Sequence, residues 1–237
     1  KVLEFMGLCR TMRIGAIYAC QDYYEHPVFR MANGIIVSSP YMKEQLNNLG
    51  LENVHYVDDA LEFIPDVRKK HARKQGLCVC WYGNREKLDY SRQFLKDLRH
   101  PMTLLTISNS PDADICMGYG QKTPWDTRLV ADTLIDRADI VAIPIADDNK
   151  SAAYAKSANR ITFPMSLGIP VVATPIPTYE LVIRDGVNGF LPRTSAGWLA
   201  ALSALEDEKK REEVGLHSLD EVRRKFSIAS IAGQYVQ

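Results

Sequence analysis

The chain has 237 residues, and its 29 Lys and Arg balance 29 Asp and Glu, so the formal net charge is zero. This balance argues against the broad positive field by which proteins hold nucleic acid, and the 46% of apolar residues is ordinary for a globular protein. No apolar run approaches the roughly 20 residues that a membrane-spanning helix requires.

The first 66 residues contain three short apolar runs that predict β-strands, at residues 14–20, 34–38 and 54–57. The pair Ser39-Pro40 predicts a helix start, because proline is tolerated in the first turn of a helix. Gly50 predicts the end of the same helix.

A polar stretch at residues 21–26 follows the first apolar run, in a position that faces ligands in a parallel sheet. Asp22 and His26 are therefore candidates for ligand-binding or catalytic groups. The alternative for His26 is an ordinary surface histidine.

A polar and basic run at residues 66–75 separates these strands from the next ones. We interpret this run as a solvated linker, and therefore as a domain boundary. A patch that binds phosphate or a membrane is the alternative.

Five further apolar runs follow, at residues 77–82, 103–107, 140–145, 170–174 and 189–191. Helical patterns at residues 126–137 and 198–205 lie between or after them. Several runs are continuously apolar rather than alternating, which is typical of parallel strands covered on both faces. The predicted fold class is therefore α/β, a Rossmann-like parallel sheet flanked by helices.

A loop with a glycine and two cations follows the run at residues 77–82. Gly83 and Asn84 lie where the chain turns toward a helix, and Arg85 and Lys87 come next. Glycine lets the backbone approach a phosphate closely, and either cation can neutralise that phosphate. The loop is therefore a candidate phosphate site.

Two looser candidates are Ser108, directly after a predicted strand, and Trp125, directly before a predicted helix. Ser108 could contact a ligand, with a plain turn as the alternative. Trp125 could pack against a ring of a ligand, with core packing as the alternative. Asp147 and Asp148 have no nearby histidine, so we predict no metal site.

The most informative stretch is residues 156–191, in which a helix, a stop at Gly168 and a buried strand lead into a loop. A loop that leaves the carboxyl end of a parallel strand is where open α/β sheets bind ligands. The helix that follows it begins near Pro177, Thr178, Tyr179 and Glu180, and backbone N–H groups at such a start favour anions. The glycine-containing turn at residues 185–189 is most simply structural.

This stretch resembles the C-terminal, donor-binding domain of GT-B glycosyltransferases, especially the retaining enzymes of family 4 (glycosyl transferases group 1). Residues 168–174, Glu180 and residues 185–189 match that pattern in order and spacing. Residues 31–39 are similar to the last strand of the N-terminal domain in the same family, and Trp198 and residues 226–228 fit its closing pattern.

The helix before Gly168 departs from the family pattern. Many members carry Glu-x7-Glu there, and those carboxylates contact the donor's sugar and ribose, but the two positions here are Ala155 and Phe163. The segment is instead similar to a subgroup with Lys-Ser-x-Asn-Arg. That resemblance places four residues at the donor: Lys156, Ser157, Asn159 and Arg160.

A cation beside a diphosphate makes strong, charge-assisted hydrogen bonds. Lys156 and Arg85 are accordingly the candidate catalytic residues, which would stabilise the departing diphosphate. A solvated helix face is the alternative for Lys156 and Arg160.

The resemblance also implies a domain organisation. Residues 1–66 would be the last elements of a truncated or reduced N-terminal, acceptor-side domain, which would make Asp22 and His26 acceptor-side residues. Residues 76–225 would form the nucleotide-sugar-binding domain, and residues 226–237 a helix that packs back on the N-terminal part. Since the sequence starts at Lys1, we expect a piece of a longer polypeptide.

The function that the resemblance implies is transfer of a sugar from a nucleoside-diphosphate sugar to a glycan, lipid or other acceptor, with retention of anomeric configuration. A nucleotide-sugar-binding module that is inactive without a partner chain or a missing domain is the alternative. A sugar-nucleotide epimerase is a third reading, which the lack of a carboxylate acid/base pair disfavours. No cofactor is expected besides the donor substrate.

The five cysteines form no Cys-x-x-Cys pair, and their odd number predicts reduced thiols in a cytoplasmic protein. Peripheral placement at the inner face of a membrane stays open. The expected partners are a nucleotide sugar, its acceptor, and a partner domain or second copy, without nucleic acid.

Overall fold

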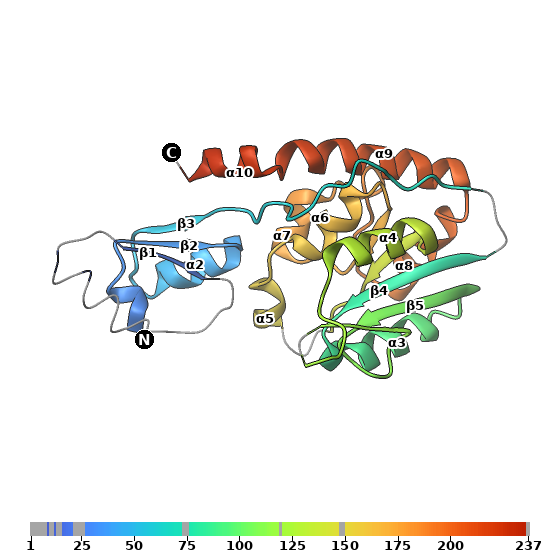
Figure 1. Cartoon of the computed structure of the whole chain (residues 1–237), viewed down its shortest axis with the longest axis horizontal. Helices are drawn as coiled ribbons and strands as arrows, with labels where there is room; N and C mark the ends of the chain where they lie inside the picture. Colours follow the sequence, from blue (N-terminus) through green and yellow to red (C-terminus); the bar gives the residue numbers. More distant parts are fainter. Residues whose placement is uncertain are drawn as a thin grey trace.

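The computed structural model describes residues 9, 12, 16–20, 27–72, 76–118, 120–146 and 150–235. It contains two parallel sheets, one of three strands in the order β1-β2-β3 and one of five in the order β6-β5-β4-β7-β8. Figure 1 shows the two sheets in separate lobes, joined by an extended segment after β3 and approached again by the last helix. The α/β fold class predicted from the sequence is thus confirmed.

The N-terminal lobe contains β1 (Ile17–Cys20), a short 3-10 helix η1 (Pro27–Arg30), β2 (Gly34–Val37), α2 (Pro40–Asn48) and β3 (Val54–Tyr56). Helix α2 starts at the predicted place, because Ser39 Oγ accepts the amide of Met42 at 3.2 Å and Pro40 occupies the first turn. It ends before Gly50, whose φ of 79° lies in the left-handed region that glycine adopts without strain.

Residues 66, 67, 70 and 72 of the run at residues 66–75 are exposed, as a solvated linker predicts, but other side chains of the run pack against the C-terminal lobe. The Lys69 side chain is buried, and its Nζ donates to the carbonyl of Ile135 at 2.8 Å. Arg68 pairs with Glu212 at 2.7 Å. The aliphatic stem of a lysine can be buried when its ammonium reaches an acceptor, and charge pattern alone does not show this.

The C-terminal lobe alternates strands and helices. Its elements are β4 (Leu77–Gly83), η2 (Arg85–Lys87), α3 (Leu88–Asp97), β5 (Met102–Ser108), β6 (Ile115–Cys116), α4 (Thr127–Arg137), β7 (Ile140–Ile143), α5 (Lys150–Tyr154), α6 (Asn159–Ser166), β8 (Val171–Ala173), α7 (Pro177–Val182), α8 (Ser195–Ala204), α9 (Glu208–Lys225) and α10 (Ile228–Gln234).

Most predicted strands of this lobe are confirmed, and two differences stand out. The two-residue strand β6 was not predicted, because two residues are too short for a periodic signal. Residues 189–191 form no strand of their own, although Phe190 makes a parallel bridge to Val172 of β8.

Helices cover both faces of the five-stranded sheet. One apolar cluster lies under α4 and α6 and includes Leu134, Ile161 and Met165. The other lies under α3 and α8 and includes Leu95 and Leu202. All four residues of β7 are buried, as expected for a central parallel strand.

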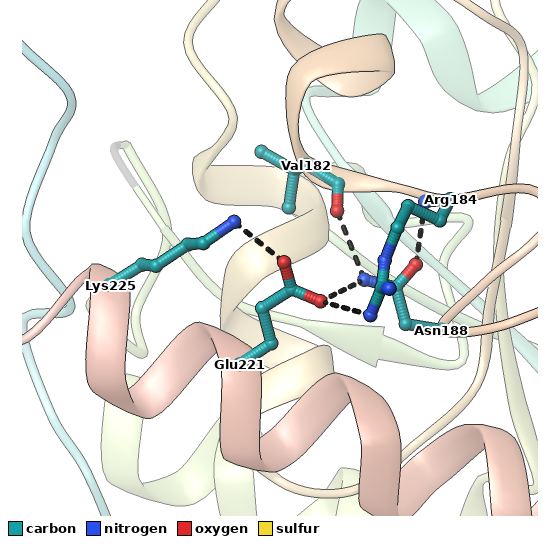
Figure 2. Close-up of polar contacts among 5 residues, drawn as sticks. All are labelled: Val182, Arg184, Asn188, Glu221 and Lys225. Atoms are coloured by element: carbon teal, nitrogen blue, oxygen red, sulfur yellow. Dashed lines mark hydrogen bonds and ion pairs between the residues drawn. The ribbon is translucent and has the colours of Figure 1, made fainter.

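The turn at residues 185–189 is held by a buried asparagine, as Figure 2 shows. Asn188 Nδ2 donates to the carbonyl of Val182 and to Glu221 Oε2, both at 3.0 Å, and its Oδ1 accepts the amide of Arg184 at 2.7 Å. Glu221 on α9 also binds Arg184 and Lys225. The motif therefore fastens the turn to α9, which agrees with its structural interpretation.

Helix α10 continues from α9 back toward the N-terminal lobe (Figure 1). Its Ile231 belongs to the same apolar cluster as Val57 and Leu61, which follow β3. Within the described residues, no helix combines the length and apolar character that crossing a bilayer requires.

Candidate functional site

The order of the five-stranded sheet reverses between β4 and β7, which are neighbours at its centre. From β4 the chain passes through α3 to β5 on one side, whereas from β7 it passes through α5 and α6 to β8 on the other. Such a reversal leaves a crevice beyond the carboxyl ends of the two strands, where open α/β sheets bind ligands. Gly83 ends β4 at this crevice.

Arg160, from the first turn of α6, reaches the end of β4. Its Nη2 donates to the carbonyl of Tyr82 at 2.5 Å, and its Cζ lies 5.6 Å from the centre of the Trp81 ring. A Cβ atom added to Gly83 would lie only 2.8 Å from Arg160 Nη2. A side chain at position 83 would require the flexible end of Arg160 to move, so the two predicted site residues lie together.

No carboxylate pairs with Arg160 within the described part of the chain, although Arg68, Arg184 and Arg193 each pair with a glutamate. Its Nε is buried without a hydrogen-bond partner there. A positive charge that is half-buried and not neutralised attracts an anion. The carboxyl end of β4 therefore presents a cation to any anionic ligand in the crevice.

The predicted phosphate loop after β4 is tied to the neighbouring strand. The amide of Arg85 donates to Asn109 Oδ1 at 2.8 Å, and Asn109 directly follows β5. The side chains of Asn84, Arg85 and Lys87 are exposed. Glu86 lies 3.8 Å from Arg85 Nε, but both side chains are about 65% exposed, so water screens this pair.

The segment before α6 contacts the loop after β8. Thr178 Oγ1 donates to the carbonyl of Lys156 at 2.9 Å, which joins this segment to the first turn of α7. The Lys156 side chain is exposed and that of Ser157 is half-buried. Asn159 Nδ2 donates to Asp59 Oδ2 at 2.9 Å, so this predicted donor-binding residue links α6 to the segment after β3.

An aromatic slot of about 140 Å³ lies beside Arg160, between α6, the start of α4 and the segment after β3. The rings of Tyr82 and Trp125 face each other with centroids 6.3 Å apart. Burial raises the pKa of the Tyr82 hydroxyl, whose proton is donated to the carbonyl of Arg160 at 2.7 Å. Trp125 is 42% exposed, and this exposure agrees better with a position at a ligand site than with packing in the core.

A larger hollow of about 450 Å³ opens beside the carboxyl ends of β7 and β8, on the side of α3 and α8. Aromatic side chains from two helices form one wall, with Phe94 and Trp198 in edge-to-face contact at 5.2 Å. Arg193 lies at its rim and pairs with the predicted donor residue Glu180. Neither Tyr90 nor Phe94 was predicted as a site residue, since two aromatic side chains four positions apart on a helix are typical of a core face.

Three predicted donor residues do not offer their side chains to a ligand. Tyr179 is 1% exposed, and burial among apolar neighbours raises the pKa of its hydroxyl. Thr178 is fully buried and bound to Lys156. Ser108 is also fully buried, with its Oγ accepting the amide of Ser110 at 3.3 Å. Burial excludes the side chains alone, and the expectation that backbone N–H groups at the start of α7 favour an anion stays a prediction. Pro177 occupies the first turn of α7 and is half-buried.

Asp22 and His26, the predicted acceptor-side residues, lie outside the described residues, as do Asp147 and Asp148. Among the residues that the structure does describe, no group of three or more His, Cys, Asp or Glu is placed to hold a metal ion.

Phe163 and Leu61 line the slot, and neither was predicted as a site residue. Phe163 was noted only as a departure from a family pattern, because an apolar residue on a helix usually signals the core. Leu61 follows β3, more than 20 positions before Tyr82 in the chain, so no local pattern connects them.

Comparisons with known proteins identify the fold but no sequence family. No family model matches the chain, and no curated protein matches its sequence. Anabaena HepE, solved with UDP and glucose, is similar in structure with a TM-score of 0.69 at 15% identity. The similarity covers 99% of this chain and 74% of HepE.

Two further solved structures are similar. Staphylococcus aureus TarM, in a complex that includes UDP, has a TM-score of 0.64 at 13% identity over 98% of this chain and 53% of TarM. Sucrose-phosphate synthase from Thermosynechococcus elongatus has a TM-score of 0.63 at 12% identity over 98% of this chain and 70% of that one. These are GT-B glycosyltransferases, so the chain has the GT-B fold, over about half to three quarters of their lengths.

Proposed function

Because this chain has the fold of GT-B glycosyltransferases, we propose that it transfers a sugar from a nucleoside-diphosphate sugar to an acceptor. The observation that carries the proposal is the guanidinium of Arg160, which lies beside Gly83 at the reversal of strand order without a carboxylate partner among the described residues. An anion is the complement of such a site, and a diphosphate is the anion of this donor class.

The residues of the crevice would have separate roles in binding and in transfer. Arg160 and Arg85 would hold the diphosphate, and Lys156 would neutralise the charge that develops on it as the bond to the sugar breaks. The aromatic slot would receive a ring of the nucleoside. The chain would therefore act by positioning the donor and stabilising its leaving group.

The finer details of this proposal rest on resemblance. We propose retention of anomeric configuration, a glycan or lipid acceptor, a role in polysaccharide biosynthesis, and a cytoplasmic place that includes peripheral contact with a membrane. HepE was also solved with UDP-glucose, which supports a nucleotide sugar as the donor.

A binding module without transferase activity of its own is a second candidate. It is favoured by one observation, that Ala155 and Phe163 stand where many members of the resembling family carry the two carboxylates that contact the donor. Such a module would bind the donor and need a further domain or partner chain for the acceptor.

Thermal unfolding in the presence of UDP, GDP, CDP, TDP and their common sugars tests the donor site. A ligand at about 100 times its Kd stabilises the native state by about 2.7 kcal/mol, which corresponds to roughly 5–10 °C in Tm for a chain of this length. We expect one nucleotide to give this shift and Arg160→Met to reduce it to about a third at the same ligand concentration.

The matched control is Arg224→Met, which removes an exposed arginine from α9, far from the crevice in sequence. If no nucleotide shifts the Tm, the proposed function is refuted. If a donor binds but no nucleoside diphosphate is released with any glycan or lipid acceptor, the binding module replaces the transferase.

A further inference from the structure

The larger hollow beside β7 and β8 has an aromatic wall. Tyr90 of α3 is 38% exposed, and its ring lies 6.0 Å from that of Phe94, which in turn contacts Trp198 of α8. A ligand that packs a flat face against these rings removes apolar surface from water. The volume of about 450 Å³ lies within the range of about 300–1,000 Å³ that small-molecule sites have.

Polar side chains of the hollow have donors to offer to a ligand. Trp198 is 2% exposed, and its indole N–H has no acceptor among the described residues. Thr174 Oγ1 accepts the amide of Ile145 at 3.0 Å, and its own proton is left for another acceptor. The same holds for Thr194, whose Oγ1 accepts the amide of Gly197 at 3.1 Å. Since a buried donor without a partner is costly, these groups favour a ligand that carries oxygen atoms.

The charges at the rim of the hollow neutralise each other. Arg193 pairs with Glu180, whereas Arg160 in the crevice has no carboxylate partner among the described residues. A paired guanidinium attracts an anion less than an unpaired one does, so the hollow suits a neutral ligand and the crevice an anion. A sugar ring is neutral and combines an apolar C–H face for the aromatic wall with hydroxyl oxygens for the donors.

The hollow and the crevice lie at the same edge of the five-stranded sheet. Ile145 and Thr174 follow the parallel strands β7 and β8, just as Gly83 ends β4. Tyr154 of α5 also lines the hollow, and its carbonyl accepts Ser39 Oγ of the N-terminal lobe at 2.8 Å. Figure 1 shows α5 on the side of the C-terminal lobe that faces the N-terminal lobe. A sugar in the hollow would therefore lie at the edge where the diphosphate of a donor would bind.

We propose that the hollow binds a neutral sugar of the acceptor, an inference that rests on the proposed function. The acceptor is then a glycan, and the C-terminal lobe holds both substrates. A hydroxyl oxygen of the bound glycan would form the new bond to the donor's anomeric carbon as the bond from that carbon to the diphosphate breaks. The hydroxyl proton would leave with the nucleoside diphosphate.

The indole N–H signals of the three tryptophans test this placement by NMR, because Trp125 lies in the slot and Trp198 in the hollow. Trp125→Phe and Trp198→Phe assign the two signals. The probes are the methyl glycosides of glucose, galactose, mannose, N-acetylglucosamine and rhamnose at up to about 10 mM, which detects millimolar dissociation constants. We expect at least one glycoside to move the Trp198 signal and leave that of Trp125 in place.

Variants of Tyr90 connect sugar binding to the wall of the hollow. Tyr90→Ala should weaken binding of the glycoside by about tenfold, whereas Tyr90→Phe keeps the ring and should keep the affinity. Tyr235→Ala, an exposed tyrosine of the C-terminal end, is the matched control. In the transfer assay, Tyr90→Ala should raise the KM for the acceptor by the same factor and leave the dissociation constant of the nucleotide unchanged. Circular dichroism confirms that the variants are folded.

The failures of this inference and of the proposed function are distinct. If no glycoside moves the Trp198 signal, or if one moves that of Trp125 instead, the hollow is not the acceptor site and the proposed donor site stands. If a glycoside binds in the hollow but does not accelerate release of nucleoside diphosphate from the donor, its role as the acceptor is refuted. If no nucleotide binds, the proposed function is refuted and the acceptor role falls with it.

Discussion

Two polar segments of the C-terminal lobe carry the resemblance to glycosyltransferases, and the structure gives them opposite roles. In the turn at residues 185–189, the buried Asn188 makes three hydrogen bonds, all of them to protein groups. In the segment at residues 156–160, Arg160 donates to one carbonyl and has no carboxylate partner in the described chain. Polar groups whose bonds all end within the protein stabilise the fold, whereas an uncompensated charge at an open crevice is available to a ligand.

The largest expected effect belongs to the segment at residues 156–160. Lys156→Ala should lower the turnover of sugar transfer by about 10²–10³-fold, the loss typical when a donor that stabilises transition-state charge is removed. The measurement is release of nucleoside diphosphate with the donor identified by the binding screen. Lys209→Ala, an exposed lysine of α9, is the control, and unchanged turnover in Lys156→Ala would remove this residue from the mechanism.

Asn188→Ala should affect stability rather than binding. It leaves the carbonyl of Val182 and the amide of Arg184 without their partner, so we expect a loss of about 3 kcal/mol in the free energy of unfolding. Urea unfolding measures this loss. The exposed neighbour Val187→Ala should change the free energy by less than about 0.5 kcal/mol. A larger effect on nucleotide affinity than on unfolding would reverse the assignment of the turn.

Arg160→Met should show the opposite pattern to Asn188→Ala. Loss of a charge-assisted hydrogen bond to the diphosphate should weaken nucleotide binding by about 2 kcal/mol, or roughly 30-fold in Kd. Titration calorimetry measures the affinity, and urea unfolding should report a smaller change. If the variant loses stability but keeps its nucleotide affinity, Arg160 belongs to the scaffold like Asn188.

Gly83→Ala tests the close approach of backbone and guanidinium. The added methyl would lie 2.8 Å from Arg160 Nη2, so the side chain of Arg160 must move. We expect a stability loss of about 1 kcal/mol and several-fold weaker nucleotide binding. In the Arg160→Met background, the added methyl should lower the free energy of unfolding by less than it does in the wild type. A double-mutant cycle of the two variants measures this coupling. A coupling of zero would mean that the two residues do not interact.

The smallest expected effect is a pH dependence at the turn. Burial alone would raise the pKa of Glu221, but hydrogen bonds and charges from Lys225 and Arg184 outweigh it and hold that pKa below its usual value of 4.5. A lowered pKa contributes stability above pH 4.5, and this stability is lost as the pH falls through the folded value. Glu221→Gln should therefore cost about 0.5–1 kcal/mol at pH 7.

The cost of Glu221→Gln should shrink in urea unfolding below about pH 4, where protonation removes the charge from the wild type as well. If the loss in free energy of unfolding stays constant down to pH 3, Glu221 stabilises the turn by packing and not by its charge. Asp220→Asn, an exposed acid one position earlier, is the matched control.

The sequence predicted the fold better than it predicted the side chains of the site. Most of the apolar runs became strands, and the helix signals at Ser39 and Asp126 became caps, because these depend on neighbours a few residues away. Tyr179 and Ser108 were placed at a ligand but lie in the core. Polar residues at strand and helix ends alternate between core and surface, and only the tertiary packing decides which way each one turns.

By itself, the sequence determined a parallel α/β sheet, a glycine and cations after a central strand, and a polar segment before Gly168. Only the tertiary structure brought Arg160 beside Gly83, buried Lys69 against Ile135, and joined Leu61 with Trp125 and Phe163 in one slot. Periodicity and turn chemistry act over a few residues, so a sequence records them directly. The charge and shape of the site depend on side chains tens of positions apart, which come together only when the strand order is fixed.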